Sequence, residues 1–172
     1  MKVIYKASEG APFGDSAAQK IGEQIKLIEK KFGQVTPDIV VKEASDPGHF
    51  LHDYFEWDNN VGAENWRKQQ ARNIINHLIV VREYKGDDKE VKAYFSVTTD
   101  DNEKQYVSVE VVLKNEDYRD QIIQESLREI IYWKEKNRDY QELELIFEAI
   151  EKTQKEIQFK KSKKEVTAQV SA

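Results

Sequence analysis

The sequence predicts an α+β fold, with three N-terminal helices, a three-stranded antiparallel meander and a C-terminal helical hairpin. Three observations support this. Apolar residues recur every three or four positions toward both ends of the chain, and β-branched and aromatic residues alternate with polar ones in between. The chain is also 39% hydrophobic, which is enough for a folded core.

The first helix is predicted over residues 15 to 32. Its apolar stripe, spaced by three and four positions, consists of Ala17, Ala18, Ile21, Ile25, Ile28 and Phe32. The letters SAAQ fit a capping box, in which Ser16 and Gln19 satisfy each other's free amides. Gly33 suits the left-handed residue that follows a helix end.

Two further helices are predicted before the strands. Thr36 as N-cap and Pro37 at the first helical position begin a short second helix, which Asp46-Pro47-Gly48 ends. The third helix is predicted to begin after Asp58 or Asn60. Its apolar positions are Ala63, Trp66, Ala71, Ile74, Ile75 and Leu78.

Three strands are predicted at 78–84, 91–98 and 105–112, because these segments are rich in β-branched and aromatic residues and the second and third alternate. The polar segments KGDDKE and TDDNEK separate them and have the composition of turns. Strands joined by such short turns predict an antiparallel meander with one buried face.

Two long helices are predicted after the strands. Asn115 opens the fourth helix, and a fifth follows the polar interruption EKNRD, so that together they predict a helical hairpin. The apolar periodicity stops near residue 158. Residues 1–157 are therefore predicted as a single domain and residues 158–172 as a disordered basic tail.

Composition excludes several classes of function. The chain has no cysteine, which excludes disulfides, thiolate nucleophiles and cysteine-based metal sites. No stretch approaches the ~20 apolar residues of a membrane span, so we expect a soluble, cytoplasmic protein without a membrane partner. The net charge is -5, and the last fifteen residues hold four lysines against one glutamate, a balance of +3 that leaves -8 elsewhere. Such an acidic body does not attract nucleic acid through its overall field.

The stretch HFLHDYFEWDNN at 49–60 concentrates aromatic and acidic side chains. His49 and His52 lie near three acids and are residues that bind zinc or manganese, but His77, the only other histidine, lies in a helix pattern, so no metal site is predicted. The apolar side chains favour a segment that packs on the core, with Trp57 stapling the chain before Asp58 as N-cap. The alternative is a partner-binding surface of Phe50, Tyr54, Phe55 and Trp57.

Sequence motifs of catalysis are absent. The chain has no nucleophile elbow, no phosphate-binding loop and no glycine-rich fingerprint. The paired acids Asp87-Asp88 and Asp100-Asp101 fall in predicted turns, where solvated carboxylates are common. We therefore predict no catalytic residue and no cofactor.

Three helices followed by two strands and a charged turn match the order of a winged helix. In this alternative the nucleic-acid-binding residues are Arg67, Lys68 and Arg72 on the third helix and Lys85 near the wing. The long connection from 46 to 59 and the acids at the wing's tip argue against it. A solvated helix face is the simpler explanation of these charges.

The motifs FEWD at 55–58 and QQAR at 69–72, followed by AYFSV, YVSVEVVL and LREIIYWKEKNRDY, resemble a group of small uncharacterised proteins of phages and prophages. The resemblance covers about residues 14 to 152. It implies a mobile-element origin and action in a host cell, and it implies no catalytic residue because the group has no established activity. His49 lies outside the shared pattern.

Two functional hypotheses follow. The first is a non-catalytic phage accessory protein that acts through protein–protein contacts, as an adaptor, inhibitor or assembly component, using the aromatic segment and the C-terminal helices. Self-association is left open. The second is a DNA-associated regulator or replication accessory, in which the third helix contacts phosphates and the lysine tail adds unspecific affinity.

Overall fold

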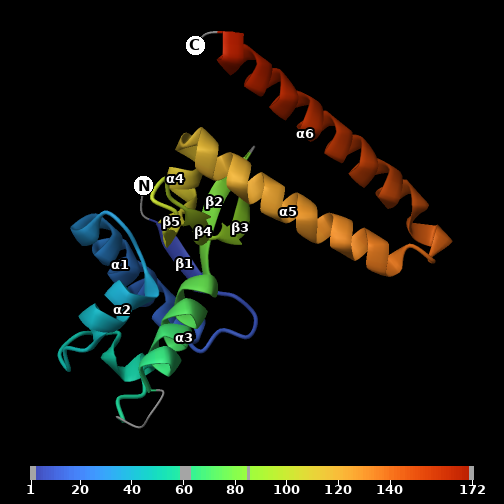
Figure 1. Cartoon of the computed structure of the whole chain (residues 1–172). Coiled ribbons are helices and arrows are strands. Elements are labelled where there is room, and N and C mark those ends of the chain that lie inside the picture. Colours follow the sequence, from blue (N-terminus) through green and yellow to red (C-terminus); the bar gives the residue numbers. More distant parts are fainter. Residues whose placement is uncertain (1–2, 59–62, 85, 171–172) are drawn as a thin grey trace. The chain divides into compact units, whose positions relative to one another are not determined.

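The computed structural model describes residues 3–58, 63–84 and 86–170 and shows an α+β protein (Figure 1). The chain divides into two compact units, Met1–Arg119 and Asp120–Ala172. This division differs from the single domain predicted over 1–157. The sequence does not mark the boundary because one continuous helix, α5 (Glu116–Asn137), runs across it.

The three predicted N-terminal helices are confirmed as α1 (Asp15–Phe32), α2 (Pro37–Ala44) and α3 (Ala63–Asn76). Gly33 ends α1 with a φ of 73°, and its N–H donates to the Glu29 carbonyl. Thr36 caps α2, since its hydroxyl accepts from the Ile39 N–H at 3.2 Å. Residues 59–62, which precede α3, lie outside the described residues, so the predicted start at Asn60 does too.

A first strand, β1 (Ile4–Ala7), precedes the helices and was not predicted. It pairs antiparallel with β2 (Leu78–Tyr84), so the sheet order is β1-β2-β3. The predicted capping box of Ser16 and Gln19 is wrong, because α1 begins at Asp15. Gln19 accepts instead from the Tyr5 N–H at 3.0 Å, and Asp15 accepts from the Ala7 N–H at 2.8 Å. These two side chains of α1 thus satisfy the edge of β1 that β2 does not cover.

The predicted meander is wrong, because the second predicted strand belongs to two sheets. β3 (Asp87–Lys92) pairs with β2, whereas β4 (Tyr94–Thr98) pairs with β5 (Lys104–Ser108). Gly86, with a φ of 88°, lies in a tight turn between the paired residues Tyr84 and Asp87. This turn lets β3 begin within the segment predicted as a polar turn.

The third predicted strand ends early. β5 stops at Ser108, and Val109–Lys114 forms the short helix α4. Of the three alternating valines, Val107 therefore lies in β5, whereas Val109 and Val111 lie in α4. The extended backbone of Ser108 separates the strand from the helix. Val112 is buried, 4% exposed, which is the inward position of a helix rather than of the alternating strand.

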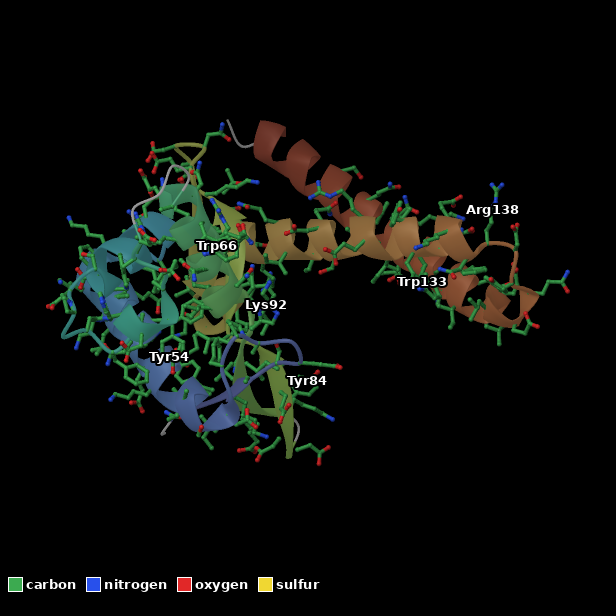
Figure 2. The ribbon with its side chains drawn as sticks, turned by 90° about the horizontal axis from the view of Figure 1, so that it is seen from below. Tyr54, Trp66, Tyr84, Lys92, Trp133 and Arg138 are labelled. Atoms are coloured by element: carbon green, nitrogen blue, oxygen red, sulfur yellow. The ribbon has the colours of Figure 1, made fainter. Side chains whose placement is uncertain are left out.

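The core of the first unit is formed by side chains of α1, α2, α3 and the strands. Its fully buried large residues include Ile21, Ile25, Ile28, Val35, Val40, Leu51, Ile74, Ile75, Leu78 and Tyr94. Each such side chain contributes about 1.5–3 kcal/mol by leaving water. Trp66 differs from the prediction, because it is 54% exposed on α3 (Figure 2).

The second unit is a hairpin of α5 and α6 (Glu144–Val170), joined through the short helix η2 (Gln141–Leu143) (Figure 1). Asn115 caps α5 as predicted, since its side chain accepts from the Tyr118 N–H at 3.0 Å. In contrast to the disordered tail predicted over 158–172, α6 continues to Val170. This part of the sequence lacks glycine and proline and is rich in lysine and glutamine, which favour helix.

Among the described residues, no helix combines the length and the apolar character needed to cross a membrane.

Candidate functional site

The aromatic segment, residues 50–57, packs on the core of the first unit between α2 and α3. Phe55 is 7% exposed, and Phe50, Tyr54 and Trp57 are partly buried against the core. The ring centroids of Phe50 and Tyr54, and those of Phe55 and Trp57, are 5.7 Å apart. Tyr54 also meets Phe13 edge-on at 6.4 Å. These contacts fit the core-packing explanation, since most of the surface of the four rings is covered by the core and by one another.

Both histidines of this segment are engaged in local structure. The His52 ring stacks on Trp57 with centroids 4.8 Å apart, and its Nδ1 lies 2.8 Å from the Ala44 carbonyl oxygen. The His49 Nδ1 accepts from the Leu51 N–H at 3.2 Å. Within the described ranges, no group of three or more potential metal-binding side chains gathers. The histidines therefore stabilise the local conformation of the segment and do not converge on a common metal-binding position.

The basic residues of α3 are largely occupied by neighbouring groups. The Arg67 guanidinium lies 5.4 Å from the Trp57 ring centroid and donates to the Glu56 carbonyl at 3.3 Å. The Lys68 ammonium lies 2.7 Å from a carboxylate oxygen of Asp38 and 3.1 Å from one of Glu64. The hydrogen bonds that Lys68 donates to Asp38 and Glu64 raise its pKa.

Arg72 is exposed, and Lys85 lies outside the described residues. The four residues of the nucleic-acid alternative are thus not gathered into one open basic surface in the described structure. Two of them already bind acids or carbonyls of their own unit. A phosphate would have to displace these partners.

A groove of about 620 Å³, lined by both polar and apolar side chains, lies between the start of α2 and the β4–β5 hairpin. Its lining includes Thr36, Asp38, Arg72, Glu103, Lys104 and Tyr106. Sequence reasoning missed it because these residues come from three distant segments. The groove holds two acidic and two basic side chains, whose charges balance, so it favours neither an anionic nor a cationic ligand.

A partly buried polar cluster links α1 to the β4–β5 hairpin. Glu29 accepts from the Ser108 N–H at 3.3 Å and pairs with Lys26 at 2.7 Å. Tyr94 is fully buried, and this burial is the main cause that raises its pKa. The nearby Tyr5 and Glu29 raise the pKa further. None of these residues lines the groove, so the cluster joins elements rather than facing a ligand.

The hairpin has a seam along which its two helices meet. Phe147 and Ile150 on α6 are 4% and 8% exposed, and Leu127 on α5 is 9% exposed. The rings of Trp133 and Phe147 are 6.1 Å apart, and Lys134 pairs with Glu151. The less exposed positions on each helix recur at three and four residues, and we assign them to the seam: Gln124, Leu127, Ile131 and Lys134 on α5, and Phe147, Ile150, Gln154 and Ile157 on α6.

A second stripe, which we name the hairpin face, lies beside this seam. It consists of Ile123, Ser126, Ile130 and Trp133 on α5 and Ile146, Ala149 and Thr153 on α6, all exposed. Each of these residues precedes a seam residue by one position, on both helices, and Glu156, which precedes Ile157, ends the stripe on α6 with a charge. The same rotation away from the seam points to the same side of an antiparallel pair, so both helices contribute to one face. Figure 2 shows Trp133 on the hairpin, with Arg138 projecting at the turn.

The hairpin face carries large apolar side chains and no charge. Ile123 is 39% exposed, Ile130 45%, Trp133 41% and Ile146 48%. The Thr153 hydroxyl turns back to the Ala149 carbonyl at 2.8 Å, so it bonds within its own helix. The sequence carried a signal of this face, because the apolar positions from Ile122 to Ile131 are more than one seam needs.

Comparison with protein-family models, curated proteins and solved structures finds no match.

Proposed function

We propose that this chain is a non-catalytic binding protein that acts through protein–protein contacts, as an adaptor, inhibitor or assembly component of a phage or prophage. The contacts are made by the hairpin face. The resemblance of its FEWD and QQAR motifs to small phage proteins supports the mobile-element setting, and the exposed apolar stripe supports the mode of action.

The observation that carries the proposal is the exposure of four large apolar side chains on one uncharged face. Single exposed apolar residues are ordinary on protein surfaces, but contiguous ones on one side of an element mark interaction sites. Tryptophan and isoleucine also bury much apolar area when a partner covers them. A partner of the hairpin face would gain this area without separating any ion pair.

The hairpin face replaces the aromatic segment as the proposed contact surface. Phe50, Tyr54, Phe55 and Trp57 already contact the core and one another. Exposing them to a partner would cost the contacts that fix the path between α2 and α3. The hairpin face offers comparable apolar side chains at no such cost.

Site-specific photo-crosslinking in cells that express the full chain tests this proposal. A photoreactive phenylalanine replaces Trp133 on the hairpin face or, as the matched control, Tyr132, which is 72% exposed on the opposite side of the same helix. We expect a protein crosslink from position 133 and a much weaker one from 132. Equal yields from the two positions, or no protein crosslink from 133, would overturn the proposal.

A further inference from the structure

We infer that the partner of the hairpin face is a second copy of this chain, packed antiparallel on the first as a four-helix bundle. This inference rests on the proposed function, because it names the occupant of the same face. Both copies would use the same residues, as a two-fold symmetric interface requires.

The shape of the hairpin face fits a second hairpin. The face is two helices wide, and its natural complement is another layer of two helices packed at a shallow angle. On α5 the small Ser126 lies between the large Ile123 and Ile130. On α6 the large Ile146 is followed by the small Ala149 and Thr153. Such a surface provides both the projecting side chains and the recesses that its own copy needs.

The charge distribution along the hairpin selects the antiparallel sense. The turn end, residues 135–151, holds six acidic residues against two basic ones, a balance of -4. The opposite end, residues 120–134 together with 152–165, holds eight basic residues against five acidic ones, a balance of +3. Antiparallel packing places the acidic end of each copy along the basic end of the other, whereas parallel packing brings like charges together.

The hairpin face itself does not oppose self-association. Its seven residues carry no charge, and Glu156 lies at the end of the stripe on α6, so the apolar part of two copies meets without burying an ion. The charged residues counted above are not among the seven residues of the face, and their distribution along the sequence sets the relative direction of the copies. The same arrangement fits a foreign partner less closely, because that partner would need the opposite charge gradient along two helices.

Sedimentation of the full chain over a concentration series tests the second copy. We expect a monomer–dimer equilibrium whose dissociation constant rises at least about a hundredfold in Ile130→Glu, because two carboxylates would be buried in the interface. Tyr132→Glu adds the same charge off the face and should change the constant less than about twofold. A wild-type chain that stays monomeric, or equal effects of the two variants, would overturn the inference.

Paired spin labels test the direction of packing. The chain has no cysteine, so Arg138→Cys at the turn gives one label per copy. The face spans eleven residues of α5, roughly 15 Å, and Arg138 lies beyond its end in each copy. Antiparallel copies therefore hold these labels at least about 20 Å apart, whereas parallel copies bring them to about 10 Å. The short distance would overturn the antiparallel arrangement.

The photo-crosslinking and the sedimentation separate the two proposals. A product at position 133 that joins two copies of the chain supports both. A product with a different protein, from a chain that sediments as a monomer, overturns the second copy and leaves the proposed function standing. A crosslink confined to one chain, or none, overturns both.

Discussion

Gly22 lies in the middle of α1 where the Tyr5 ring packs against the helix. A Cβ added to Gly22 would come within 2.2 Å of the Tyr5 Cγ, an atom close to the backbone of β1. The ring cannot move aside without moving the strand. We expect Gly22→Ala to lower the free energy of unfolding by about 1–2 kcal/mol, since overpacking outweighs the ~1 kcal/mol that alanine gains in a helix. Urea denaturation measures this change.

A double-mutant cycle isolates the cause of this loss. In a Tyr5→Ala background the ring is gone, so Gly22→Ala should become neutral or stabilising by up to about 1 kcal/mol. A loss of similar size in both backgrounds would show that the Tyr5 ring is not the obstacle.

Tyr94 gives the protein a pH dependence in the alkaline range. Burial raises the pKa of Tyr94 above its ordinary value of 10.0, so the native state keeps this proton when the unfolded chain releases it. Stability from this group is therefore fully present below pH 10 and falls as the pH rises above 10. We expect Tyr94→Phe to reduce this fall by up to about 1.4 kcal/mol per pH unit, measured by urea denaturation between neutral and alkaline pH.

At neutral pH the same substitution should cost little. The buried Tyr94 hydroxyl forms no regular hydrogen bond among the described residues, and only the Tyr5 hydroxyl interacts with it, so its removal affects at most that one group. Tyr132→Phe, at a side chain that is 72% exposed, controls for the loss of one tyrosine. An equal change of the alkaline slope in both variants would contradict the role of burial.

At the scale of elements, α6 offers two phenylalanines in opposite environments. Phe147 is 4% exposed in the seam and contacts Trp133, whereas Phe159 is 70% exposed. We expect Phe147→Ala to cost about 3–5 kcal/mol of local stability, since it opens a cavity between the two helices. Hydrogen exchange should then quicken in α6 and in the second half of α5.

Phe159→Ala is the matched control on the same helix. It should leave exchange nearly unchanged, because an exposed ring loses little surface to water when it is truncated. Slower or unchanged exchange in Phe147→Ala would mean that the seam does not hold the hairpin.

The sequence predicts helices better than strands in this protein, and the reason lies in how their signals arise. The stripes of α1 and α3 and the cap at Thr36 are local, so pattern and cap residues identify them directly. The assignment of strands to sheets depends on distant partners. Ala93 separates β3 from β4 because its N–H donates to the Leu78 carbonyl at 2.9 Å and its carbonyl accepts from Val109 at 2.9 Å. Nothing in the letters VKAYFSV marks that division.

Candidate sites, like secondary structure, can be predicted from the sequence where their signals are local and not where they depend on distant residues. The interpretation of residues 50–57 as a core-packing segment rests on local composition, and the contacts of the four rings agree with it. The groove beside α2 brings Asp38, Arg72 and Glu103 together only through folding, and no spacing in the sequence predicts it. The hairpin face could be predicted only in part. The spacing of its residues along each helix is local, but their gathering on one side depends on how α5 and α6 pair.

At the scale of the whole molecule, charge decides how the protein meets DNA. The net charge is -5, and Arg67 and Lys68 are already engaged with groups of their own unit. We expect fluorescence anisotropy to detect no duplex binding at physiological salt and only weak binding at low salt. This weak binding should disappear when glutamine replaces the four tail lysines, Lys160, Lys161, Lys163 and Lys164. Replacing Arg67, Lys68 and Arg72 with alanine should leave the salt dependence unchanged. If the triple variant instead flattened the slope of log K against log salt by about 0.9 per lost contact, α3 would be a phosphate-binding surface and the DNA hypothesis would take precedence.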